Sequence, residues 1–331
     1  MANNHVRGQP RRLAVLMMAY GGPDSLDDVR PYLMDVRNYR PTSDTVVAEI
    51  TERYAEIGGR SPILELTRAQ GNALQDALNR EHDDDASDWR VFVGMRHWHP
   101  FIKDVLAEMV ELGYDRAVGL VMAPHYSRMS IGAYYARVAE ADAPVEVAPI
   151  ERWHLLPSYL DATAERVRDA LRRFPADARA GVPVIFTAHS LPEEIQTWDD
   201  SYPKELQETA EAVGQRIAPQ PFTFAYQSAA MTSGPWLGPD AGEVIAHLAE
   251  EGHRYLLIAP IGFVCEHVEI LYDIDIEFRR QADNLGVQLE RIEMVNDHRG
   301  MIEGLANLVS ARATEAGWLA NRDDTPTTNT K

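Results

Sequence analysis

Short apolar runs alternate with longer stretches of mixed polarity along most of this chain. The apolar runs predict buried strands. They lie at Leu13–Ala19, Trp89–Gly94, Ala117–Met122, Val145–Pro149, Val184–Ala188, Phe222–Tyr226, Tyr255–Pro260 and the more polar Gln288–Ile292. Between them, apolar residues recur every three or four positions, which indicates amphipathic helices. These are predicted at Thr45–Ile57, Thr67–Arg80, Ile102–Leu112, Ser130–Glu140, Tyr159–Phe174, Lys204–Ile217, Ala241–Glu250, Val268–Asn284 and Met301–Glu315.

Alternation of strands and helices favours βαβ units and parallel sheets. The same order of alternating strands and helices occurs once before about residue 150 and again after it. We therefore expect an α/β fold with two Rossmann-like lobes, at 11–150 and 151–315, and a cleft between them. The polar ends, 1–10 and 316–331, are expected to be flexible. Ligands of such sheets bind beyond the carboxyl ends of the strands, so residues there are the candidates for function.

A row of carboxylates follows the strand pattern that ends at Pro260. Glu269, Asp273 and Glu277 recur every fourth residue of a predicted helix. Each step of four turns the helix by only about 40°, so all three lie along one face. Like charges at this spacing repel, at a cost of roughly 0.2–0.5 kcal/mol per pair. The row therefore suggests a path for a divalent metal ion or for protons.

One histidine lies at a matching position of another strand. His189 follows the apolar run 184–188 and precedes Ser190, which with Glu193 fits the pattern of a helix-capping box. A neutral imidazole there can bind a metal ion or accept a proton near pH 7. A single histidine is more often structural, but both this residue and the carboxylate row are expected at the same edge of one sheet.

Other strand ends carry aromatic and cationic residues, and each of these residues has two possible interpretations. Tyr20 in MAYGGP either faces the cleft or is a boundary residue in water, and Tyr134 after APHYS either flanks a flat ligand or packs in the core. Arg53, before IGGRSP, either holds carboxylates of a ligand or forms surface pairs. Trp236 either forms a wall of an apolar cleft or is core. His97 and His99 form a poor metal pair, because in an extended chain they point to opposite faces.

The composition limits the binding partners, the cysteine chemistry and the location that the chain can have. The 331 residues include 51 acidic and 32 basic ones, for a net charge of −19. This charge disfavours nucleic acid and anionic membrane surfaces. Because Cys265 is the only cysteine, an internal disulfide is impossible and an iron–sulfur cluster is not expected. The start of the chain does not resemble a signal peptide, and no apolar run is long enough to span a membrane, so a cytoplasmic location is expected.

In their order along the chain, MAYGGP, IGGRSP, APHYS, TAHSLP, QSA…PWLGPD and GFVCEHVEILYDID resemble the ferrochelatase family, which inserts ferrous iron into porphyrins. The resemblance covers about residues 11–310. It implies that His189 and Glu269 form the metal-insertion centre and that Asp273 and Glu277 guide or hold metal. It places Tyr20 near the metal. Residues implied to line the porphyrin or hold its propionates are Arg37, Arg53, Tyr54, Ser61 and Tyr134.

The details resemble the soluble Gram-positive type, which uses coproporphyrin III. This chain has MAYGGP, and its segment Pro31–Pro41 is short and polar where other branches carry an apolar lip. The resemblance implies a monomer with porphyrin and Fe²⁺ as substrates and no permanently bound cofactor. The alternatives are a protoporphyrin IX ferrochelatase, a cobalt chelatase and a non-catalytic haem or iron carrier. A cobalt chelatase is disfavoured because such enzymes use a second metal-binding histidine where this chain has Glu269.

Overall fold

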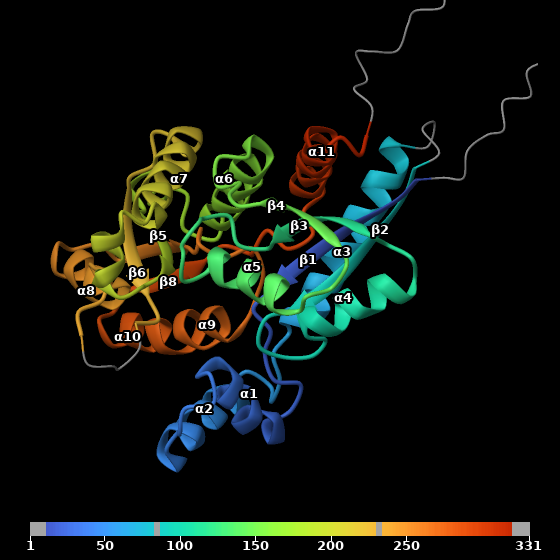
Figure 1. Cartoon of the computed structure of the whole chain (residues 1–331). Coiled ribbons are helices and arrows are strands. Elements are labelled where there is room, and N and C mark those ends of the chain that lie inside the picture. The colour runs from blue at the N-terminus through green and yellow to red at the C-terminus, as the bar shows by residue number, and fades with distance from the viewer. Residues whose placement is uncertain (1–10, 83–86, 230–233, 320–331) are drawn as a thin grey trace, which may run out of the picture.

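Two parallel four-stranded sheets form the frame of the computed structural model, which describes residues 11–82, 87–229 and 234–319 (Figure 1). The first sheet has the order β2-β1-β3-β4 and the second the order β6-β5-β7-β8. The strands are β1 (Arg11–Ala19), β2 (Ser87–Met95), β3 (Arg116–Val121), β4 (Glu146–Ile150), β5 (Val184–His189), β6 (Phe222–Gln227), β7 (Tyr255–Ala259) and β8 (Gln288–Arg291). The predicted strands and the α/β fold with two parallel sheets are confirmed.

Helices cover both faces of the sheets, so the central strands are apolar without alternation. Every described position from Leu13 to Ala19 is buried, as is every position of β5 before His189. The helices that match predictions are α2 (Asp44–Glu56), α3 (Ile63–Glu81), α4 (Ile102–Glu111), α5 (Ile131–Glu140), α6 (Pro157–Leu171), α7 (Tyr202–Ile217), α8 (Ala241–Glu250) and α11 (Arg299–Glu315).

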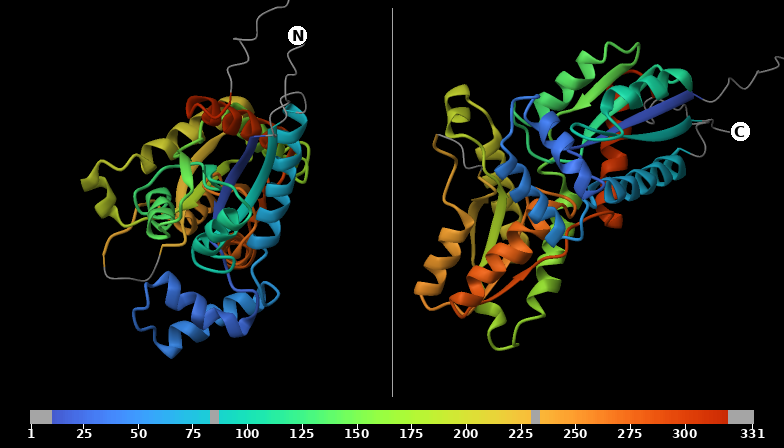
Figure 2. Two further views of the ribbon diagram at one scale, coloured as in Figure 1. Left: turned by 45° about the vertical axis from the view of Figure 1, so that its right-hand side comes forward. Right: turned by 90° about the horizontal axis from the view of Figure 1, so that it is seen from below.

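The sequence analysis did not predict one helix, α1 (Val29–Val36). Its sequence is largely polar but has a narrow apolar face, on which Val29, Tyr32 and Leu33 pack against Tyr54 of α2 and Trp98. Figure 1 and the left view of Figure 2 show α1 and α2 (blue) standing away from the sheets at one end of the molecule.

The predicted continuous helix 268–284 is divided into three parts. A short α9 (Val268–Leu271) leads into a π-helix (Asp273–Phe278), and α10 (Arg279–Asn284) follows. In the π-helix the amide of Glu277 donates to the carbonyl of Tyr272, five residues back, at 3.0 Å. A π turn rotates less per residue than an α turn, so residues four apart lie more nearly above one another.

The helices join the two lobes more closely than a boundary at residue 150 suggests. α11 packs against α3 and α6, and one hydrophobic core contains Val15 of β1, Phe186 of β5 and Leu305 of α11. Trp318 is also buried in this core, so the chain stays packed beyond the predicted start of the tail at 316. The predicted flexible segment 1–10 and the part 320–331 of the predicted tail 316–331 lie outside the described residues. Among the described helices none is both long and apolar enough to cross a bilayer.

Candidate active site

A cavity of about 350 Å³ lies where the carboxyl ends of strands from both sheets face each other. Its walls come from the segments after β1, β2, β3, β5 and β7 and from α1, α2, α5, α7 and α9. The position agrees with the general rule for ligand sites in parallel sheets. Six of the site residues predicted from the sequence line it, and these are Tyr20, Tyr54, Ser61, Tyr134, His189 and Glu269.

The loop after β7 reaches His189 because of a glycine. A Cβ atom at Gly262 would lie 2.5 Å from the Cβ of Ala188, so only glycine lets the loop pass this close to β5. The amide of Gly262 donates to the carbonyl of Thr187 at 3.1 Å. Gln227, at the end of β6, then donates to the backbone carbonyl of Glu269 at 2.9 Å. These contacts place α9 beside the end of β5.

His189 and Glu269 face each other in this position. The Nε2 atom of His189 lies 3.6 Å from Oε2 of Glu269. The other ring nitrogen, Nδ1, contacts the carbonyl oxygen of Ser190, which can only accept, so Nδ1 carries the proton of a neutral ring. In the neutral ring Nε2 is then the nitrogen that can accept a proton, and it is the one beside Glu269. The predicted capping box is wrong, because the Ser190 hydroxyl instead donates to the carbonyl of Leu237 at 2.7 Å.

Glu269 lies between two imidazoles. The Nε2 atom of His267 is 3.9 Å from Oε2 of Glu269, and this buried oxygen has no hydrogen-bond partner. Burial opposes ionisation of the carboxyl, but His189, His267 and Ser228 outweigh it and hold the pKa of Glu269 below its usual range. The carboxylate is therefore ionised and has an oxygen available. The sequence analysis did not assign a role to His267.

Asp273 and Glu277 continue from Glu269 toward the surface. Asp273 is buried, accepts a hydrogen bond from the Ser228 hydroxyl and has Oδ1 3.8 Å from Nη1 of Arg53. Burial and the charge of Glu269, with a smaller contribution from Glu277, raise the pKa of Asp273 to about 7. Glu277 is exposed. Neither Asp273 nor Glu277 lines the cavity. The predicted row thus runs from solvent to the cavity wall.

This row does not form a closed metal site. Over residues 11–82, 87–229 and 234–319, no three histidine, cysteine, aspartate or glutamate side chains are placed to hold one metal ion together. His189 and Glu269 offer two donors, and the next carboxylate lies farther along the π-helix. Such an arrangement suits an ion that passes through better than one that stays.

Tyr20 lies on the first lobe's side of the cavity with a cation beside it. Its ring centroid is 4.6 Å from that of His97, and the guanidinium carbon of Arg96 lies 5.9 Å from it. Arg96 also stacks on Tyr134 at 5.4 Å and lines the cavity, a position that the sequence analysis missed. Burial, partly offset by Arg96, raises the pKa of Tyr20 to about 12, so the phenol stays protonated.

His97 pairs with a carboxylate of α1. Its Nδ1 atom lies 2.7 Å from Oδ1 of Asp35 on α1. Burial lowers the pKa of His97 to about 4 despite this carboxylate. The contact ties α1 to the end of β2, next to Tyr20.

Three of the predicted porphyrin residues do not reach the cavity wall. Arg53 lies between Glu49, at 3.1 Å, and Asp273. Arg37 is exposed at the end of α1. Trp236 is partly buried, with its ring centroid 6.5 Å from that of His189.

Comparison with known proteins decides the family. The ferrochelatase family profile matches residues 12–313. This chain belongs to the ferrochelatase family. The ferrochelatase of Herpetosiphon aurantiacus is 40% identical over 305 residues, which cover 91% of this chain and 99% of that protein. The coproporphyrin III ferrochelatase of Listeria monocytogenes is 34% identical over 303 residues, with coverage of 90% and 97%.

A solved structure agrees on the fold. SirB from Bacillus subtilis with Fe³⁺ superposes with a TM-score of 0.54, at 11% identity, over 92% of this chain and 97% of that one. At this identity the likeness concerns the two-lobed fold alone. Family membership makes the chain a ferrochelatase, an enzyme that inserts metal into a porphyrin, and this agrees with a cavity flanked by a histidine and a carboxylate.

Proposed function

We propose that this ferrochelatase inserts Fe²⁺ into coproporphyrin III. The observation that carries the proposal is the orientation of α1, which turns its apolar residues inward and lines the cavity with Tyr32. Its outer face carries Arg30 and Arg37, both exposed. Arg30 pairs with Asp44 at 2.6 Å, so we propose Arg37 as the residue that binds an additional propionate, which coproporphyrin III, with four propionates, offers and protoporphyrin IX, with two, does not. The similar relatives named coproporphyrin III ferrochelatase support the same substrate.

The reaction removes two pyrrole protons and admits one divalent cation. Nε2 of His189 is the proposed base, because Nδ1 is fixed against the Ser190 carbonyl. It takes the two protons one after the other and releases each toward solvent by way of Glu269 and the carboxylate row. The imidazolium that results is stabilised by Glu269, at 3.6 Å. Planar porphyrin shields its nitrogen lone pairs, so a cavity that favours a bent ring would stabilise the transition state.

Glu277, Asp273 and Glu269 are proposed as the route of the metal substrate. Fe²⁺ accepts both carboxylate and imidazole ligands. Successive weak contacts let the ion move on from each carboxylate to His189 and Glu269. Tyr20, protonated at neutral pH, is proposed to face the opposite side of the ring, beside Arg96.

We propose that the enzyme works as a monomer, as its resemblance to the soluble type implies, and that it acts in the cytoplasm. The absence of a permanently bound cofactor also stays a prediction.

The test is anaerobic Fe²⁺ insertion followed by absorbance, with coproporphyrin III and protoporphyrin IX in parallel. We expect kcat/KM to favour coproporphyrin III by about tenfold or more, equivalent to about 1.4 kcal/mol. In the same assay Arg37→Ala should reduce the preference. Arg80→Ala, which removes another exposed guanidinium, on α3, should leave it unchanged.

Each other outcome has a definite meaning. Preference for protoporphyrin IX would contradict the proposed substrate and keep the chelatase. If neither porphyrin were metallated but finished haem bound tightly, the chain would act as a carrier.

A further inference from the structure

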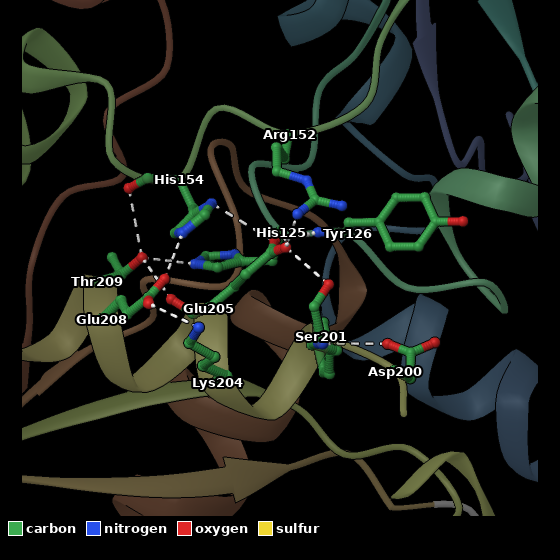
Figure 3. Close-up of polar contacts among 11 residues, drawn as sticks. His125, Tyr126, Arg152, His154, Asp200, Ser201, Lys204, Glu205, Glu208 and Thr209 are labelled. Atoms are coloured by element: carbon green, nitrogen blue, oxygen red, sulfur yellow. Dashed lines mark hydrogen bonds and ion pairs between the residues drawn. The ribbon is translucent and has the colours of Figure 1, made fainter. Parts of the chain in front are cut away.

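A second polar cluster lies behind the cavity wall, where the loop after β3 meets helix α7 (Figure 3). This loop, residues 122–130, belongs to the first lobe, and α7 belongs to the second. Five loop residues line the cavity, namely Met122, Ala123, His125, Met129 and Ser130. Metal insertion as described above uses none of the polar residues in the cluster.

Glu205 on α7 is the centre of the cluster. It is only 2% exposed, and it accepts hydrogen bonds from the amide of Tyr126 at 2.6 Å and from the hydroxyl of Ser201 at 2.7 Å. Arg152 lies 3.3 Å and His154 3.4 Å from the same carboxylate. Figure 3 shows these four groups converging on Glu205. A buried carboxylate is costly unless its partners are in place, so it favours one arrangement of the loop over others.

Two further contacts fix the same loop to the same helix. Asp200, just before α7, accepts hydrogen bonds from the amide of Arg128 at 2.8 Å and the hydroxyl of Ser127 at 3.1 Å. The Nε2 atom of His125 lies 2.8 Å from Oγ1 of Thr209. Four successive residues in the middle of the loop, 125–128, are therefore held, and the backbone there has little freedom to move relative to α7.

The same helix also contacts the metal-insertion centre. The hydroxyl of Tyr202 donates to the backbone carbonyl of His189 at 3.0 Å, and Tyr202 lines the cavity. Glu205 follows Tyr202 by less than one helical turn. Helix α7 thus connects the backbone of the proposed base to the loop that forms the opposite part of the wall.

We propose that Glu205 is a positioning residue for porphyrin metallation. It does not line the cavity, but it holds the loop 122–130 at a fixed place relative to His189, so that the wall is already shaped when the porphyrin arrives. Preorganisation of this kind lowers the cost of binding. The inference rests on the ferrochelatase activity and not on the choice of porphyrin.

The test compares Glu205→Ala and Glu205→Gln with Glu208→Ala as the control. Glu208 lies on the same helix and contacts the same His154, at 3.0 Å, but its known partners, His154 and Lys204, lie outside the loop 122–130. Initial rates are measured with the porphyrin that the wild-type chain metallates best, by varying porphyrin and metal separately. Thermal unfolding and amide exchange of residues 123–130 are measured on the same samples.

We expect Glu205→Ala to raise the KM for porphyrin by about fivefold or more and to speed amide exchange in the loop, with the KM for metal changed by less than about twofold. Glu205→Gln keeps an oxygen that can accept from Tyr126 but loses the charge that faces Arg152 and His154, so its porphyrin KM should rise by less than that of Glu205→Ala and still exceed the wild-type value. Glu208→Ala should resemble the wild type in both respects.

An unchanged porphyrin KM in folded Glu205→Ala would overturn the proposal, even if its Tm fell. If that variant does not fold, Glu205→Gln decides alone: faster loop exchange with a higher porphyrin KM supports the role, and wild-type values for both overturn it. A wild-type chain that metallated no porphyrin would instead contradict the metallation chemistry itself.

Discussion

The two ring nitrogens of His189 have different partners, and this difference suits the residue to proton transfer. Nδ1 is held by the Ser190 carbonyl, while Nε2 faces Glu269 across 3.6 Å. A base whose tautomer is already fixed needs no reorganisation before it accepts a proton. Glu269 stays ionised because His189 and His267 outweigh the effect of its burial on its pKa. The pair therefore combines a proton acceptor with a negative charge that stabilises the protonated form.

His189→Ala should lower kcat for metal insertion by roughly 100-fold or more, the usual contribution of a positioned base. The KM for porphyrin should change little, because the rest of the cavity wall is unaltered. Initial rates followed by absorbance measure both values. His247→Ala is the matched control, since His247 is exposed on α8 and pairs with Glu251 at 3.5 Å. A loss of less than about threefold for His189→Ala would contradict its role as the base.

At the residue scale, the sequence predicts those site residues that directly follow a strand or recur at helical spacing. His189 and Glu269 have such positions, and the structure brings them together. Arg96 also directly follows a strand, β2, but the sequence analysis considered only His97 and His99 there, and no local pattern shows that Arg96 stacks on Tyr134. His267 reaches Glu269 only through the backbone path that Gly262 permits. Close approaches of this kind arise from packing and leave no mark in a local pattern.

At the scale of elements, the segment 268–284 shows where periodicity reaches its limit. The four-residue spacing predicts a helix with three carboxylates on one face. The structure is consistent with this, because Glu269 and Glu277 both raise the pKa of Asp273. The π turn from Asp273 to Phe278 is not encoded in a pattern of apolar residues. It is held by tertiary contacts, including the bidentate pair between Arg291 and Asp275 at 2.9 Å. The register of the row therefore depends on β8 as well as on the helix.

Asp273→Asn should raise the KM for the metal ion by roughly fivefold, since losing one charged contact costs about 1 kcal/mol. The KM for porphyrin should stay the same, because Asp273 does not line the cavity. Steady-state rates at varied metal concentration provide the measurement. Asp283→Asn removes the same charge from an exposed position on α10 and should have no effect. Equal metal KM values for the two variants would show that the row does not guide the metal.

At the scale of the whole molecule, the cavity exists because two sheets are held at a fixed distance. The sequence predicts both sheets, yet it assigns α11 to the second lobe, since helices are expected to pack near the strand that precedes them. In the structure α11 packs against α3 of the first lobe and against α6 of the second. One continuous core thus joins Val15, Phe186 and Leu305. Gln70 of α3 adds a polar link, donating to the carbonyl of Asn296 at 3.0 Å.

A shared core predicts that the two lobes unfold together. Leu305 is fully buried on α11, so Leu305→Ala should reduce the free energy of unfolding by about 2–5 kcal/mol. The space that the missing side chain leaves lies in the core that both lobes share. On heating, the near-UV circular dichroism transition and the loss of insertion activity should therefore shift to lower temperature by the same amount, in a single transition. Leu285→Ala, at an exposed position after α10, is the control and should leave the Tm nearly unchanged. Two separate transitions in Leu305→Ala would show that the lobes unfold independently. The position of His189 relative to Tyr20 would then have to be fixed by a bound ligand.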